Sequence, residues 1–125
     1  MKSNRPINLD IATIKLPLTN IVSFAHRLSG IAIFFGTALL LYILQISLKS
    51  EEDFELALQI MDGPIFTVTI WIIIAAILYH LIAGIKHLLL DMGIGETKQG
   101  AKIGAIVVVT LFVLFIPFLS AWLWQ

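Results

Sequence analysis

The sequence predicts an all-α integral membrane protein with three transmembrane helices, and its composition and charge spacing are the reasons. Hydrophobic residues make up 59% of the 125 residues, charged residues make up 13%, and mean hydropathy is +1.00. A soluble domain would have about 25% charged residues. Three runs of 21 or 22 residues contain no Asp, Glu, Lys or Arg and a single His, His80. About 20 apolar residues cross the hydrocarbon core of a bilayer, so we expect three spans and no water-soluble domain.

The expected elements follow these three runs. Within a single domain of residues 1–125 we expect an inner-surface segment at 1–20, spanning helices at about 21–48, 64–90 and 103–124, an outer loop at 49–63 and an inner loop at 91–102. Phe54, Leu58 and Met61 recur at helical spacing within the outer loop. This spacing predicts a short surface helix that ends at Gly63-Pro64.

Prolines mark two further features. Pro6 and Pro17 interrupt residues 1–20, which we expect to be extended along the inner membrane surface, with a disordered tail as the alternative. Pro117 lies inside the third span, where a proline is tolerated if neighbouring groups satisfy the freed carbonyl. The third helix is otherwise without chemical features, and we expect it to pack rather than react.

The distribution of positive charge predicts the orientation. Seven of the eight Lys and Arg residues lie in residues 1–27 or 86–102. Positive residues favour the cytoplasmic or matrix side, so we expect the N-terminus inside and the C-terminus outside. Trp122 and Trp124 suit an outer interfacial aromatic belt.

Several functional classes are excluded by composition. The chain has no Cys, so it holds no iron–sulfur cluster, thiolate metal site or disulfide. Its formal net charge of +0 gives no support for nucleic-acid binding. No glycine-rich phosphate loop follows a strand, which excludes a flavin or nucleotide domain within this sequence.

A first polar stripe is predicted at the inner end of the first span. Its members recur at positions i, i+3, i+4 and i+7 and are Ser23, His26, Arg27 and Gly30. A hydroxyl, an imidazole and a guanidinium beside an apolar helix suit a ligand with an apolar tail and polar carbonyls, such as a quinone. The alternative for Arg27 is snorkelling to lipid phosphates.

A second stripe is predicted on the second span. It consists of His80, Gly84, His87 and Asp91, flanked by Ala76 and Ala83. A histidine inside a bilayer is costly, which favours a function, here axial ligation of a haem iron. Ala83 and Gly84 would offer a flat macrocycle a close-approach surface. The alternative for His80 is a hydrogen bond to a neighbouring helix that serves packing.

Counting histidines predicts a partner. A six-coordinate haem needs a second axial ligand, and we expect His26 and His87 to lie at the inner interface, too shallow to oppose His80. The second ligand would then come from another polypeptide, and the three helices would form part of a hetero-oligomeric helical bundle.

Both stripes together resemble the cytochrome b subunits of succinate dehydrogenase, the larger membrane anchors of succinate:quinone oxidoreductase. The matching residues are Arg5-Pro6 followed by Asn8-Leu9, then Ser23-x-x-His26-Arg27-x-Ser29-Gly30, and finally His80-x-x-x-Gly84-x-Lys86-His87-x-x-x-Asp91. Three helices is also the architecture of that family. Two departures are visible: Lys86 stands where Arg is usual, which loses a planar fork, and Leu90 stands where Met or an aromatic residue is usual.

The resemblance implies roles for six residues. His80 would be the axial ligand of a haem b shared with a smaller anchor subunit. Ser23 and Arg27 would bind ubiquinone or a related quinone. His26, His87 and Asp91 would be candidates for contacts to haem propionates or for proton transfer.

The resemblance also implies a setting. The chain would not be an enzyme on its own but a subunit of respiratory complex II, with flavoprotein and iron–sulfur partners, in a bacterial inner membrane rather than a mitochondrial one. Electrons from succinate oxidation would pass to the quinone pool. Two alternatives stay open: a haem-free quinone-binding anchor of a succinate dehydrogenase or fumarate reductase, and a small proton-conducting transporter or assembly subunit.

Overall fold

The computed structural model describes Asp10 and residues 15–125. The conformation expected for the N-terminal segment, and the motif residues Arg5-Pro6 and Asn8-Leu9, therefore lie outside the described residues.

The described part of the chain forms four helices. They are α1 (Leu18–Ser47), α2 (Glu51–Met61), α3 (Pro64–Asp91) and α4 (Lys98–Leu123). The helices α1, α3 and α4 are long and apolar enough to cross a membrane, which confirms the all-α class and the prediction of three spans. The short helix predicted in the outer loop is α2.

Local sequence chemistry explains where α2 and α3 begin. The Ser50 hydroxyl accepts a hydrogen bond from the Asp53 backbone N–H at 3.0 Å and caps α2. Three acidic residues in the first turn of α2 complement the positive end of its dipole. Pro64 opens α3, where its missing N–H costs nothing.

A glycine turn ends α3 and leads into α4. Gly93 has φ +81°, and the Ile94 N–H donates to the Leu89 carbonyl at 2.9 Å. Thr97 caps α4 by accepting a hydrogen bond from the Gly100 N–H at 3.0 Å. The helix α4 thus begins at Lys98, five residues before the predicted start, because a charge-free run marks the bilayer core and not the cap.

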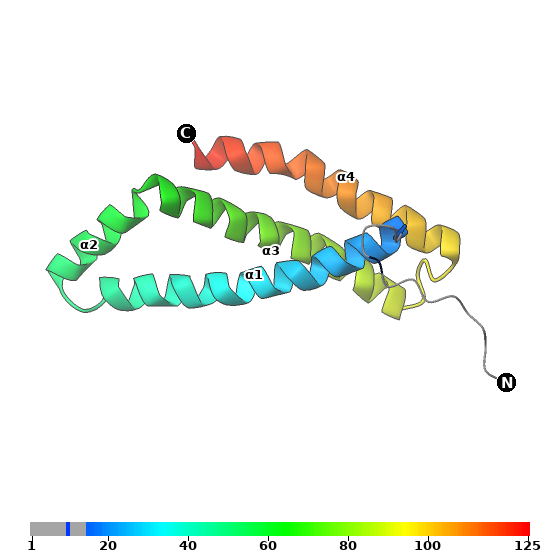
Figure 1. Ribbon diagram of the computed structural model, residues 1–125, viewed down its shortest axis with the longest axis horizontal. Helices are drawn as coiled ribbons and strands as arrows, with labels where there is room; N and C mark the ends of the chain where they lie inside the picture. The colour runs from blue at the N-terminus through cyan, green and yellow to red at the C-terminus, as the bar shows by residue number, and fades with distance from the viewer. Residues whose placement is uncertain (1–9, 11–14) are drawn as a thin grey trace.

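The three long helices lie side by side, and α2 joins the far ends of α1 and α3 (Figure 1). Two small clusters hold them together. Near the start of α1, Val22, Ala83, Ala105 and Val108 are buried where α1, α3 and α4 meet. At the opposite end of α1, Ile43, Ala57 and Phe66 join α1, α2 and α3.

Two hydrogen bonds and one glycine contact also join the long helices. Tyr79 donates its hydroxyl hydrogen to the Val22 carbonyl at 2.9 Å, which links α3 to α1. Trp71 donates its indole N–H to the Ser120 hydroxyl at 3.0 Å, which links α3 to α4. A Cβ at Gly36 would lie 2.7 Å from Cγ1 of Ile73, so α1 and α3 approach closely there because Gly36 has no side chain.

Candidate functional site

The three histidines of the chain form one cluster between α1 and α3. The ring of His26, from α1, stacks on the ring of His80 with centroids 4.0 Å apart and planes 19° apart. The ring of His87 also contacts the His26 ring, with centroids 4.9 Å apart and planes 60° apart. Because His80 and His87 are two turns apart on α3, the His26 ring bridges them.

Two glycines make room for these rings in a reciprocal way. A Cβ at Gly30 of α1 would lie 3.2 Å from Cε1 of His80, and a Cβ at Gly84 of α3 would lie 3.6 Å from Nε2 of His26. Each helix therefore presents a glycine to the histidine of the other. From the sequence, Gly30 was grouped with His26 and Gly84 with His80, because each pair lies on one helix. The structure shows instead that each glycine faces the histidine of the other helix.

His80 is held by its Nδ1 atom. This atom lies 2.9 Å from the Ser29 hydroxyl and 3.1 Å from the His26 backbone carbonyl. The Ser29 hydroxyl in turn donates to the same His26 carbonyl at 2.7 Å. Ser29 is only 7% exposed. Sequence reasoning assigned Ser29 no role beyond its place in the motif, since a serine in an apolar helix usually bonds only to its own helix.

The contact between His26 and His80 was not predicted from the sequence. We expected His26 and His87 to lie at the inner interface, too shallow to oppose His80 across a haem, and the structure stacks the His26 ring directly on the His80 ring. The start of α1 crosses the later part of α3 (Figure 1), where Tyr79 bonds to the Val22 carbonyl, and residue counting along separate helices cannot anticipate this crossing.

Ala83 does not offer a surface to a macrocycle, which is a second correction. Its relative exposure is 0% because it packs against Val22, Ala105 and Val108. Gly84 faces His26 rather than the surroundings of the bundle. The small residues of α3 serve contact between helices of this chain.

The four residues of the polar stripe predicted on α1 do not face one site. His26 and Gly30 face α3, whereas Ser23 and Arg27 line a separate shallow hollow of about 250 Å³ together with Asn20 and Phe24. The Arg27 side chain is exposed and Ser23 is half-buried. None of the three histidines lines this hollow.

The remaining candidates lie at the edge of the cluster. Asp91 ends α3 with an exposed side chain. Two buried ring nitrogens, Nε2 of His26 and Nδ1 of His87, have no hydrogen-bond partner. Within Asp10 and residues 15–125, no group of three His, Cys, Asp or Glu side chains is arranged to hold a metal ion by itself.

The side chain of Lys86 lies against α4. A Cβ at Gly104 of α4 would lie 3.5 Å from Cγ and from Cε of Lys86, so the lysine stem runs along α4. Lys86 also lines an apolar groove of about 530 Å³ between α3 and α4.

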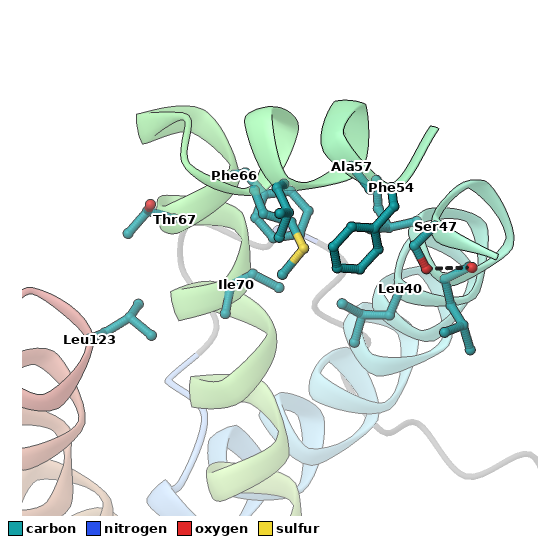
Figure 2. Close-up of a pocket in the computed structure, with 12 residues that line it drawn as sticks. Leu40, Ser47, Phe54, Ala57, Phe66, Thr67, Ile70 and Leu123 are labelled. Carbon is teal, nitrogen blue, oxygen red and sulfur yellow. Dashed lines mark hydrogen bonds between the residues drawn. The ribbon is translucent and has the colours of Figure 1, made fainter. Parts of the chain in front are cut away.

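Another hollow lies at the other end of the bundle, where α2 meets α1 and α3. Its volume is about 580 Å³. Figure 2 shows its walls, which include Leu40 and Ser47 of α1, Phe54 and Ala57 of α2, Phe66, Thr67 and Ile70 of α3, and Leu123 of α4. None of the site residues predicted from sequence lines it. The dashed bond in Figure 2 runs from the Ser47 hydroxyl to the Leu44 carbonyl, at 2.8 Å, within α1.

Comparison with known proteins agrees with the arrangement of these motifs. Residues 1–118 match the family described as the succinate dehydrogenase/fumarate reductase transmembrane subunit. A succinate dehydrogenase cytochrome b556 subunit from Coxiella burnetii is 33% identical over 125 residues, which cover 99% of this chain and 100% of that protein.

Two further relatives show the same similarity. A succinate dehydrogenase cytochrome b556 subunit from Paracoccus denitrificans is 30% identical over 92% of this chain and 95% of its own length. A mitochondrial succinate dehydrogenase cytochrome b560 subunit from Sus scrofa is 34% identical over 90% of this chain and 68% of its own length. With the three spans, the histidine cluster and a family match over almost the whole sequence, the chain belongs to the succinate dehydrogenase/fumarate reductase transmembrane subunit family.

Proposed function

We propose that this chain is the membrane-anchoring cytochrome b subunit of a succinate dehydrogenase, in which it provides one axial ligand of a b-type haem and part of a quinone-reduction site. The observation that supports this best is the state of the His80 ring. Both of its hydrogen bonds to described residues use Nδ1, which leaves Nε2 to bind another group.

This arrangement fits a haem ligand. A metal-binding histidine usually donates its second ring N–H to an oxygen, which fixes the ring and raises its basicity. Ser29 and the His26 carbonyl are such oxygens for His80. When bound, a haem supplies a one-electron centre beside the quinone site.

The second axial ligand is assigned to a partner subunit. The His26 and His80 rings are in contact, with centroids 4.0 Å apart, so no macrocycle fits between them. His26 therefore cannot oppose His80 across a haem in this arrangement. The smaller anchor subunit, which the family resemblance implies, would supply the opposing histidine.

The quinone site is proposed at the hollow near the start of α1. The Ser23 hydroxyl and the Arg27 guanidinium line it, and Asn20 adds an amide. A hydroxyl can donate to a quinone carbonyl, and a guanidinium stabilises negative charge that develops as the quinone is reduced. The positive-inside distribution favours the inner interface for this hollow, where protons from water would reach the quinone.

The remaining polar groups are assigned supporting roles. His87 and Asp91 extend the polar path from the histidine cluster to the end of α3. His26 would contact a propionate only after a change of ring position, since its Nε2 is enclosed by its own chain. We propose that these three residues position propionates or pass protons.

The proposed setting is a complex in the bacterial inner membrane. The distribution of Lys and Arg favours the N-terminus and the α3–α4 loop on the cytoplasmic side. The iron–sulfur subunit would then approach the start of α1, with the flavoprotein bound beyond it. Succinate would be oxidised at the flavoprotein, and the electrons would reach the quinone beside Ser23 and Arg27.

A histidine substitution tests the haem assignment. In the assembled complex, His80→Ala should abolish or strongly shift the α-band of the reduced-minus-oxidised spectrum, because the iron loses an axial ligand. Tyr79→Phe removes a hydrogen bond of the adjacent residue but no ligand, and it should leave the band unchanged. An unaltered spectrum in His80→Ala would sink the ligand assignment.

An arginine substitution tests the quinone site. Arg27→Ala should lower the rate of succinate:quinone reduction by about 100- to 1,000-fold, since one preorganised donor at a developing negative charge contributes about 2.7–4 kcal/mol. Succinate oxidation with a soluble dye should stay near the level of the unaltered complex. Equal loss of both activities would show failed assembly rather than a quinone-site role.

A further inference from the structure

The one buried polar side chain that the described residues place in the core is Ser29, and it contacts the proposed haem ligand. Its hydroxyl lies in a triangle with Nδ1 of His80 and the backbone carbonyl of His26. The three sides measure 2.7, 2.9 and 3.1 Å. All three contacts are therefore within hydrogen-bond range.

The triangle determines where the His80 ring holds its proton. A carbonyl oxygen can only accept, so both Nδ1 and the Ser29 hydroxyl must donate toward the His26 carbonyl. Ser29 has one hydroxyl hydrogen, which is used in this bond. Its oxygen then accepts from the same Nδ1–H, which the carbonyl and the hydroxyl oxygen share in a three-centre bond, and a neutral His80 ring keeps its lone pair on Nε2.

We propose that Ser29 is a positioning residue that holds the orientation of the His80 ring for iron ligation and, by accepting a hydrogen bond from its Nδ1–H, lowers the reduction potential of the haem. This inference rests on the proposed function, in which His80 is an axial ligand. It adds a residue to which neither the motif nor the comparisons give a role.

The physical effect follows from the charge on the ligand. An oxygen that accepts from Nδ1–H moves electron density toward Nε2 and makes the imidazole a stronger donor. A stronger donor stabilises ferric iron more than ferrous iron, which lowers the potential. Without the hydroxyl, the His26 carbonyl is the remaining acceptor at 3.1 Å, and the ring is less firmly held.

The experiment uses the complete complex with three variants. Ser29→Ala removes the hydroxyl, and Ser29→Thr keeps it. Ser47→Ala is the matched control, because Ser47 also lies on α1 and also donates to the carbonyl three residues before it, but contacts no histidine. The measurements are haem content per flavin, the α-band and the midpoint potential of the haem by redox titration.

Ser29→Ala should assemble, and its haem potential should rise. Loss of an outer partner of a metal ligand typically costs about tenfold, and a tenfold change in the relative binding of ferric and ferrous haem equals about 59 mV for a one-electron couple. Ser29→Thr and Ser47→Ala should keep the potential of the unaltered complex.

Each other outcome overturns the inference. An unchanged potential in Ser29→Ala excludes the tuning role. An equal shift of the haem potential in Ser47→Ala or in Ser29→Thr would mean that altered packing causes the effect. If Ser29→Ala alone fails to assemble, Ser29 has a structural role. If the unaltered complex contains no b-type haem, or if His80→Ala keeps it, the proposed function itself fails and this inference fails with it.

Discussion

Ile73 contacts α1 at Gly36, a position of that helix without a side chain. Three side-chain carbons of Ile73 would lie within 3.0 Å of a Cβ at Gly36. These carbons belong to a β-branched side chain that is 6% exposed and has little freedom to turn. The packing of α1 on α3 at mid-helix therefore depends on the absence of one methyl group.

Gly36→Ala should destabilise the chain by about 1–3 kcal/mol, the usual cost of overpacking a close contact. The thermal unfolding of the purified complex in detergent measures it. Adding Ile73→Ala should recover part of the loss, since it removes all three opposing carbons. Gly104→Ala is the control, because its Cβ would meet only the flexible stem of Lys86, at 3.5 Å. Strictly additive effects of the Gly36 and Ile73 changes would contradict the contact.

The sequence predicts which residues gather at the site better than it predicts which residues touch. Spacing alone marks His80, Gly84 and His87 as one face of α3, and these three do lie along the histidine cluster. The contacts of Gly30 with His80 and of Gly84 with His26 depend on how α1 and α3 cross. The residue spacing within one helix carries no information about that crossing. Ser29 was missed for the same reason, because its partner is 51 residues away.

At the scale of elements, the observed helix starts differ from the expected ones where polar residues continue a spanning helix. The amphipathic spacing that predicts a helix in the outer loop agrees with α2, because Ser50 and Gly63-Pro64 delimit it in the sequence itself. The starts of α1 and α4 fall three and five residues before the expected 21 and 103. Both extensions contain polar residues, which a hydropathy criterion assigns to loops although they continue the helix.

Trp71 and Ser120 form a polar tie between α3 and α4 that a double-mutant cycle can measure. Trp71→Phe and Ser120→Ala each remove one partner of the 3.0 Å hydrogen bond. We expect a coupling energy of about 0.6 kcal/mol, the average for hydrogen bonds between membrane helices. Unfolding of the complex by heat or denaturing detergent gives the four free energies. A coupling energy of zero would mean that the two side chains act independently.

At the scale of the molecule, this chain buries only a small part of its spans. Within the most apolar window of each spanning helix, 17% of the residues are buried in α1 and α3, and 11% in α4. The aromatic residues Phe34, Phe35 and Phe118 are 66–73% exposed. Lipid tails or the helices of other subunits must cover these surfaces. Hydropathy identifies such spans because it measures transfer from water, but it does not identify their neighbours.

Expression of the chain without its partner subunits tests the proposal that haem is shared. The isolated chain should insert into the membrane, since its three spans are apolar, but it should not retain a low-spin b-type haem, because His26 is stacked on His80 and cannot be the second ligand. Co-expression of the smaller anchor subunit should restore the α-band. A low-spin haem spectrum in the isolated chain would show that all the ligands lie within this polypeptide.

The turn between α3 and α4 has a mechanical consequence for the far end of the bundle. A Cβ at Gly100 would lie 2.8 Å from Cα of Gly95, so the first turn of α4 rests on the backbone of the loop that precedes it. With its 26 residues, α4 is about 39 Å long. A small change in the angle of α4 at this contact produces a larger displacement at the far end of the helix, and it would move Ser120 away from Trp71. The direction of α4 across the bilayer thus depends on the contact between Gly95 and Gly100 at its start. The hydrogen bond between Trp71 and Ser120 at its other end forms only when that direction is kept.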